Sequence, residues 1–492
     1  MFCIKFSYRH INCSISILFL VAMLNFQNVY GQIDNNADTL QNSIEEVSKV
    51  DYLMIEDIQM IGNKRTKEQI ILRELSFEIG DVLLESDLSA LFKEDKNKLI
   101  RTRLFLSVDI AYNKLPSNKV SVLIKVSERW YIFPFPIFKI HARNFNDWWQ
   151  NLDHDFNRTS YGIKFYQYNI RGRNEKLKLQ AQFGFIKDFE IRYQIPYLNK
   201  TQKNGLSMGV GYTQNNQIVF ETRENKQKFI DFGNTTGDAS YAYLIFTNRP
   251  SFYSTNSLTI AYQKDNVHDS IAILNPNYFQ NGTASQYYFR LKYQFKKDHR
   301  NEVAYPLHGY LLDFSINKLG LGISDDINQL EVSINYFKFI DLNKNYYLST
   351  RIGGEFNALN NSSYKNARAI GYKPNSIRGY ELYVVDGQNF VLHKTTFKKQ
   401  LFKAEGTIPF LKAKQFKTVP IAVYLKTYFD WGYVSNDYSN SEQQNSLTNQ
   451  FLYGTGLGLD IVTYYDFVLR IEYSLNNNGD TGFFINFKSD LK

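Results

Sequence analysis

The feature that most constrains the fold of this chain is a two-residue alternation of apolar and polar side chains along many short segments. In residues 287–296 (YYFRLKYQFK), the odd positions are Tyr, Phe, Leu, Tyr and Phe, and the even positions are Tyr, Arg, Lys, Gln and Lys. Residues 467–475 (FVLRIEYSL) alternate in a similar way. Because side chains of a strand point alternately to opposite faces, each segment predicts a strand with one greasy and one more polar face.

From residue 161 onward, about sixteen such runs are separated by polar turns, with roughly 20 residues for each strand and its connection, which suits tilted membrane strands. The chain has 36 Tyr and 39 Phe, yet its mean hydropathy is −0.38. No apolar run near ~18 residues follows residue 31, which excludes membrane-spanning helices. We therefore predict a mostly β fold, with a 16-stranded transmembrane antiparallel β-barrel over residues 161–492. A large soluble sandwich or propeller is the alternative.

Residues 1–31 have the pattern of a cleaved secretory signal peptide, with a short basic start, an apolar stretch over 11–26, and VYG before the cut. Cleavage would remove both cysteines, Cys3 and Cys13, so we expect an exported protein without disulfides. Residues 32–50 are polar and predict a linker. The formal net charge of +9 is spread along the chain, which argues against nucleic-acid binding.

Helix and strand signals fill residues 51–128. A strand over 54–60 ends at the turn pair Gly62-Asn63, where glycine is favoured because it adopts positive φ freely. The remaining predicted elements are helices over 66–74 and 86–102 and strands over 105–112 and 120–126. The order β-α-α-β-β predicts one small α/β domain. Residues 129–160 are then expected to connect it to the barrel.

The sequence gives little support for enzyme chemistry. Its histidines show no metal-binding spacing, and the G-x-S-x-G motif is absent. The glycines at 454, 456 and 458 lie in a strand pattern with no helix after it, where they ease strand curvature or packing. We therefore predict no catalytic residue, metal site or cofactor.

Several motifs, taken in order, resemble those of the BamA/TamA-type outer-membrane assembly family. The α/β domain is similar to the family's POTRA module at IQMIGN (58–63), RT (65–66), GD (80–81) and LFLSV (104–108). The barrel region is similar at IPYL (195–198), YPLHG (305–309), SIRGY (376–380) and FDWG (429–432). The resemblance implies a bacterial outer-membrane protein, with one POTRA domain in the periplasm and a surface-antigen-type barrel of 16 strands.

The resemblance also implies that Arg378, Gly379 and Tyr380 form the tip of the sixth extracellular loop, folded back into the barrel. Along residues 421–432 the alternation places Asp430 and Gly432 on the lumen face. Our hypothesis is that Arg378 pairs with Asp430, since a guanidinium fits a carboxylate in a bidentate way, while Gly432 leaves room for the loop.

One residue departs from the family's pattern. The family usually has an acidic residue on the strand that precedes Asp430, and this chain has Lys398 at the corresponding lumen position. Either Glu472 or Glu331 replaces that acidic residue, or Asp430 holds the arginine alone.

In the last predicted strand, Gly482, Ile485 and Phe487 have the spacing of the outer-membrane β-signal, which is recognised by edge-to-edge strand pairing. The resemblance implies an assembly factor, a specialised single-POTRA paralogue, that acts on unfolded outer-membrane or secreted client proteins in the lipid bilayer. Accessory lipoproteins are further candidate partners. A weak seam between the first strand, 161–170, and the last, 481–487, would open to template client strands. The alternative is a pore that secretes one dedicated partner protein.

Overall fold

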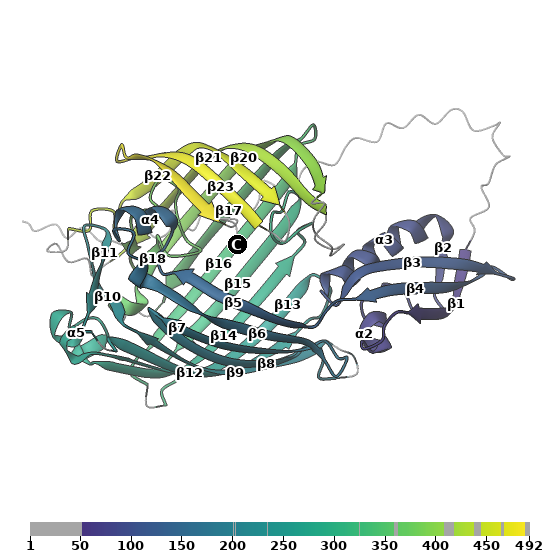
Figure 1. Cartoon of the computed structure of the whole chain (residues 1–492), viewed down its shortest axis with the longest axis horizontal. Helices are drawn as coiled ribbons and strands as arrows, with labels where there is room; N and C mark the ends of the chain where they lie inside the picture. Colours follow the sequence, from purple (N-terminus) through teal and green to yellow (C-terminus); the bar gives the residue numbers. More distant parts are fainter. Residues whose placement is uncertain are drawn as a thin grey trace, which may run out of the picture.

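The computed structural model describes residues 52–487, apart from 200, 202, 234, 324, 359–362, 408–417, 437–443 and 464–466. The predicted signal peptide and linker, residues 1–50, lie outside the described residues. So do residues 488–492, at the end of the predicted barrel. No helix within the described ranges is long and apolar enough to cross a membrane. The chain forms a small α/β domain followed by a large β-barrel (Figure 1).

The elements of the α/β domain are β1 (Tyr52–Ile61), α2 (Glu68–Leu72), β2 (Val82–Leu84), α3 (Glu85–Arg101), β3 (Phe105–Leu115) and β4 (Lys119–Glu128). Its sheet has the order β2-β1-β4-β3, in which β1 and β4 are parallel. The predicted order β-α-α-β-β is confirmed, with β2 added between the helices. Because β2 has only three residues, it shows no readable alternation in the sequence.

The two helices pack on the sheet through a common apolar core. Leu88 and Leu99 of α3 are buried against Val122 and Ile124 of β4 in this cluster. At the end of β1, Gly62 has φ +97°, and a Cβ placed there would lie 1.9 Å from the backbone oxygen of Val126. The turn therefore requires glycine on two grounds, its backbone conformation and the close approach of β4.

Helix α2 begins at Glu68, two residues later than predicted, because Thr66 has other partners. The backbone N–H and the hydroxyl of Thr66 each donate a hydrogen bond of 2.6 Å to Glu128 Oε1. The Thr66 hydroxyl also accepts a hydrogen bond of 2.8 Å from Asn169 Nδ2, which lies in the barrel. Thr66 therefore joins the α/β domain to the barrel instead of capping a helix.

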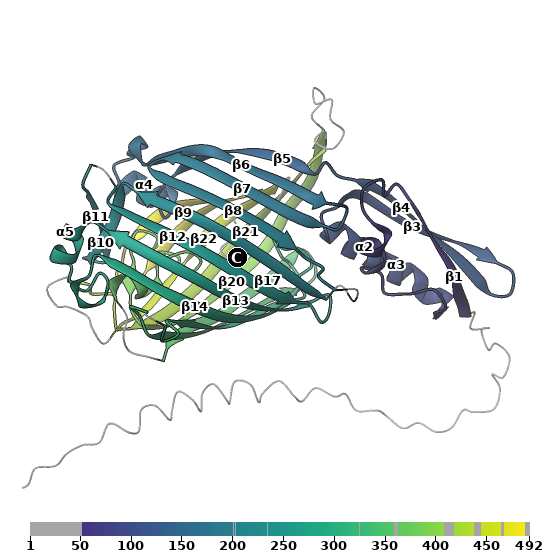
Figure 2. The ribbon, with the colours of Figure 1, turned by 90° about the horizontal axis from the view of Figure 1, so that it is seen from below.

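The barrel is a 16-stranded sheet in which each strand pairs with its neighbours in antiparallel fashion and in sequence order (Figure 2). Its strands are β5 (Ile132–Ile140), β6 (Thr159–Ile170), β7 (Glu175–Gly184), β8 (Ile186–Ile195), β9 (Asn204–Asn215), β12 (Gly237–Asn248), β13 (Ser254–Val267), β14 (Ser285–Asp298), β15 (Gly309–Leu319), β16 (Gln329–Asp341), β17 (Tyr346–Asn357), β20 (Asn389–Thr407), β21 (Thr418–Ser435), β22 (Phe451–Thr463), β23 (Phe467–Asn476) and β24 (Thr481–Phe487).

The sheet starts earlier than the sequence predicts. Residues 132–140, expected to belong to a connection, form β5, the first strand, which pairs with β6. The segment predicted as the first strand, 161–170, is therefore the second. Pro134 and Pro136 made β5 difficult to predict, because proline normally argues against a strand. The strand accommodates both prolines because it lies at the edge of the sheet.

The predicted alternation of faces is confirmed in β23. Phe467, Ile471, Tyr473 and Leu475 are exposed on the outer face, whereas Val468, Arg470, Glu472 and Ser474 are buried toward the lumen. The lumen face therefore carries charged groups, which require partners inside the barrel.

Connections that contain further short elements gather at the end of the barrel opposite the α/β domain (Figures 1 and 2). These elements are α4 (Phe145–Gln150), η1 (Phe156–Arg158), β10 (Gln217–Arg223), β11 (Lys226–Asp231), α5 (Asp269–Leu274), η2 (Gln280–Gly282), η3 (Tyr364–Asn366), β18 (Arg368–Ile370) and β19 (Val385–Asp386). The connection between β17 and β20, residues 358–388, is called the long loop below.

Candidate functional site: the loop tip inside the barrel

The tip of the long loop is held first by apolar packing. Ile377 and Tyr380 are 0% and 2% exposed, and they belong to a buried cluster with Leu392 of β20, Val434 of β21 and Leu452 of β22. These three wall residues lie on adjacent strands of the sheet. The loop tip is thus part of a core inside the barrel and is not solvent-exposed loop surface.

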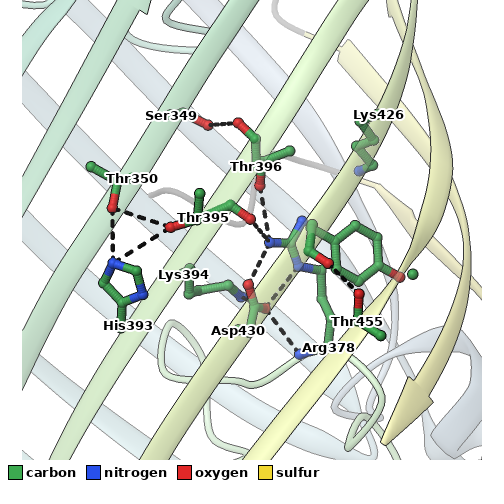
Figure 3. A network of polar contacts seen from close by, with 12 residues as sticks. Ser349, Thr350, Arg378, His393, Lys394, Thr395, Thr396, Lys426, Asp430 and Thr455 are labelled. Atoms are coloured by element: carbon green, nitrogen blue, oxygen red, sulfur yellow. Dashed lines mark hydrogen bonds and ion pairs between the residues drawn. The ribbon is translucent and has the colours of Figure 1, made fainter.

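Arg378 forms a bidentate ion pair with Asp430 of β21 (Figure 3). Its Nε donates to Asp430 Oδ2 at 2.8 Å, and its Nη2 donates to Oδ1 at 2.5 Å. The backbone N–H of Arg378 also donates to Oδ2, at 3.2 Å. The two residues are 4% and 0% exposed, so each charge depends on the other for compensation.

Three side chains from the barrel wall surround this pair. The guanidinium carbon of Arg378 lies 3.8 Å from the ring centroid of Tyr428, and Nη2 donates to Thr396 Oγ1 at 2.9 Å. Lys394 Nζ donates to the Ser376 carbonyl at 2.8 Å and lies 3.5 Å from Asp430 Oδ2. The wall therefore contacts both the guanidinium and the backbone of the loop.

Of the acidic residues considered as a second partner of Arg378, Glu472 lies close by. Its Oε1 is 3.6 Å from Arg378 Nη1. Glu331 instead accepts a 2.7 Å hydrogen bond from Asn317 on the neighbouring strand β15. Lys398 is buried and lies 4.2 Å from the ring centroid of Tyr305. The lysine that departs from the family's pattern thus stacks on an aromatic ring.

A second charged cluster lies next to the arginine. Lys426 Nζ is 2.5 Å from Asp460 Oδ1 and 2.8 Å from Glu472 Oε1, and Arg470 Nε is 3.1 Å from Asp460 Oδ1. Tyr305, from the connection between β14 and β15, donates to Asp460 Oδ2 at 2.8 Å. The cavity among these side chains is about 10 Å³, which is space for about one water molecule.

Two wall positions need glycine because the loop lies directly on them. A Cβ on Gly432 would be 2.9 Å from both Ile370 Cδ1 and Ile377 Cδ1, and one on Gly454 would be 1.9 Å from the Arg378 carbonyl oxygen. The sequence predicted the role of Gly432, whereas for Gly454 it predicted only a role in strand curvature or packing. The available signal was its place on β22, directly opposite Asp430.

The other predicted residues lie apart from this site. Gly62 and Asn63 are in the turn after β1, where Asn63 Nδ2 contacts the Thr66 carbonyl at 3.4 Å. Gly482, Ile485 and Phe487 are on β24, whose ladder partner is β23. Their role as an assembly signal stays a prediction. Within the described ranges, no group of three or more His, Cys, Asp or Glu side chains is arranged to hold a metal ion.

The outer part of the long loop has its own polar anchor. Tyr372 donates to Asp386 Oδ1 at 2.5 Å, and Arg368 lies 5.4 Å from the Tyr372 ring centroid. Burial raises the pKa of the Asp386 carboxyl. These contacts join two parts of the loop to each other, in addition to the anchor at its tip. Together, these contacts position the tip of the long loop inside the barrel.

Comparison with protein-family models gives two matches. The Omp85 superfamily domain matches residues 169–487, and a POTRA model described as a surface antigen variable number repeat matches residues 53–129. A search of curated proteins finds no match.

Solved structures with a similar fold include BamA from Haemophilus ducreyi lacking POTRA domains 1–3, at 16% identity and a TM-score of 0.52. That comparison covers 89% of this chain and 83% of that one. CdiB from Escherichia coli is similar at 11% identity and a TM-score of 0.55, covering 89% of this chain and 75% of that one. At these identities the likeness concerns the fold.

Proposed function

This chain belongs to the Omp85 superfamily, and from that premise we propose that it is an outer-membrane assembly factor that inserts client β-barrel proteins. In this proposal the barrel lies in a bacterial outer membrane and the POTRA domain lies in the periplasm. The clients are unfolded outer-membrane proteins, and accessory lipoproteins are candidate partners. No step of the proposed mechanism uses covalent chemistry or a cofactor.

The observation that carries this proposal is the open end of the sheet. The strand order runs from β5 to β24, and within the described residues no ladder joins these two strands. A barrel normally removes its edges by closing, and an unpaired edge is a template for another strand. We call the junction between β5 and β24 the seam, and we propose that a client strand adds to it.

The POTRA sheet offers a place for clients to bind first. Strand β3 ends the order β2-β1-β4-β3, and its ladder partner in that sheet is β4. An extended peptide can add to such an edge through main-chain hydrogen bonds, with little dependence on side-chain sequence. This suits a protein that receives many different clients.

The loop tip buried inside the barrel favours insertion over the alternative, secretion of a dedicated partner through the barrel. The tip of the long loop and the charged cluster around Lys426 occupy the lumen, with a cavity of about 10 Å³ between them. A secretion pore would have to release the Arg378–Asp430 pair before each passage.

Depletion of the protein tests the proposal. Quantitative proteomics of the outer-membrane fraction is expected to show loss of a set of β-barrel proteins, which would appear unfolded in the periplasm. Accumulation of one soluble partner in the periplasm, with the barrels unchanged, would support the secretion pore instead. Unchanged levels of both classes would contradict both functions.

A further inference from the structure

The outer edge of β5 lacks hydrogen-bond donors at two positions. At the end of the strand, the N–H of His141 donates to the Arg158 carbonyl at 2.8 Å, on the β6 side. The register between β5 and β6 has no bulge, and in an antiparallel pair successive residues direct their backbone groups to opposite sides. The even-numbered residues of β5 therefore face the seam. Two of them are Pro134 and Pro136, which have no N–H.

A second contact at the start of the strand gives the same orientation. The carbonyl of Tyr131 accepts a 2.7 Å hydrogen bond from the N–H of Tyr168. Odd-numbered residues thus face β6 from one end of β5 to the other. The missing donors lie on the seam side, where a regular ladder with β24 would need them.

The facing edge of β24 is bonded by a side chain and not by a strand. Asn146 of α4 donates from Nδ2 to the Phe483 carbonyl at 2.5 Å, and its Oδ1 accepts from the N–H of Ile485 at 3.1 Å. A primary amide therefore bonds two neighbouring edge groups of the strand, as an added strand would. These groups belong to the segment predicted to carry the assembly signal.

Helix α4 is itself held by the long loop, just beyond the loop tip. Arg143 donates from Nη1 to the Tyr383 carbonyl at 2.7 Å and from Nη2 to the Leu382 carbonyl at 2.9 Å. Asn144 Nδ2 donates to the Glu381 carbonyl at 2.7 Å. In Figure 1, α4 lies at the end of the barrel opposite the α/β domain. The long loop thus positions Asn146 at the seam.

We propose that the seam is held by a side-chain clasp in place of a strand ladder. Pro134 and Pro136 withhold donors on β5, and Asn146 occupies the β24 edge at Phe483 and Ile485. A client strand must displace Asn146 to pair there. Only this last step rests on the proposed function. Asn146 is therefore a positioning residue. It occupies the edge of β24 when no client is bound, without any strand pairing between β5 and β24.

Residue-resolved hydrogen exchange on the full-length protein in lipid nanodiscs tests the clasp without any client. Asn146→Ala is expected to raise exchange at the Ile485 amide by about fivefold, as loss of one net hydrogen bond allows. Asn146→Asp retains the acceptor but not the donor, and a smaller rise is expected. Asn157→Ala, an exposed residue of the same connection, is the matched control and should have no effect.

The proline substitutions are expected to act in the opposite direction. Pro134→Val with Pro136→Val restores two donors, so β5 and β24 should pair and exchange along 481–487 should slow. Phe138→Val is the control, because this seam-facing position already has an N–H. Unchanged exchange at Ile485 in Asn146→Ala would overturn the clasp. So would unchanged or faster exchange in the folded double proline variant, with folding checked by heat-modifiable migration.

Client levels in cells separate the clasp from the proposed function. If exchange shifts as expected and the double proline variant also loses outer-membrane barrels, both ideas are supported. If exchange shifts as expected and client levels stay normal in both variants, the clasp stands and the strand-templating function is wrong.

Discussion

Arg378 uses three different properties of a guanidinium at once. Its two parallel N–H groups meet the Asp430 carboxylate, its flat face lies on Tyr428, and Nη2 reaches Thr396. Lysine has a single ammonium group, which could not make the bidentate pair with Asp430 and the contact with the Tyr428 ring at the same time. The contacts therefore select arginine at this position and not merely a positive charge.

Asp430→Asn is expected to release the loop tip. The substitution removes the bidentate carboxylate partner of the buried guanidinium and leaves Glu472 at 3.6 Å. Removing one partner of a buried pair typically costs about 3–5 kcal/mol. We expect new protease cleavage within the long loop and a lower free energy of unfolding, measured in detergent. Asp269→Asn, at an exposed position in α5, should change neither, and an intact loop in Asp430→Asn would contradict the anchoring role.

The sequence predicts part of this site and misses the rest for a physical reason. Asp430 and Gly432 could be placed on the lumen face because strand alternation is a local property. The surroundings of Lys398 could not, because Tyr305 reaches it from a connection far away in the sequence. Contacts between segments that are distant in the sequence depend on how the whole sheet curves into a barrel, which no local pattern specifies.

At the scale of elements, β5 illustrates the limit of reading strands from composition. Its two prolines argue against a strand unless that strand lies at an edge, and edge position is a property of the whole sheet. By contrast, β23 was predicted because its alternation is unbroken. The two prolines that made β5 hard to recognise are also the residues that remove N–H donors from its seam-facing edge.

The junction between the POTRA domain and the barrel is built from several elements. Asn169, near the end of β6, donates to Thr66, and Arg249, after β12, lies 3.3 Å from Glu74. Tyr253 donates to Glu94 of α3 at 3.1 Å. The domain is therefore attached to the end of β6 and to the connection between β12 and β13, and its orientation is set by these contacts as well as by chain continuity.

Thr66→Val is expected to loosen this junction. Valine keeps the shape but loses the hydroxyl that links Glu128 and Asn169, at a cost of about 1–3 kcal/mol for the buried groups left unpaired. Spin labels at Lys93→Cys and Lys344→Cys should give a broader distance distribution in electron–electron double resonance. Ser117→Ala, in the exposed turn between β3 and β4, should leave the distribution narrow. An unchanged distribution in Thr66→Val would mean that other contacts alone fix the orientation.

At the scale of the whole molecule, the lumen is bridged from both ends. Arg378 enters from the far end, and Tyr305 enters from the end that carries the POTRA domain. The two meet charged groups that share Lys426, Asp460 and Glu472. Side chains that enter from the two ends of the barrel are therefore joined through one charged network inside it.

Tyr305→Ala is expected to raise the single-channel conductance of the protein in planar lipid bilayers. The ring is 4% exposed and its centroid lies 5.0 Å from that of Tyr424, so its removal opens space beside Asp460. Tyr305→Phe keeps the ring and should stay close to the unaltered protein. His308→Ala, exposed in the same connection, controls for changes at the mouth. Equal conductance in Tyr305→Ala would show that Tyr305 does not limit the passage.

The buried loop tip also predicts an order of events in the folding of this barrel. The Arg378 carbonyl lies so close to β22 that even a methyl group on Gly454 would collide with it, and the cavity alongside is about 10 Å³. The loop tip and β22 are thus in direct contact, with room beside them for about one water molecule. We expect strands β21 to β24 to be completed around a loop that is already folded, so that the chain supplies its own internal template for the last quarter of the sheet.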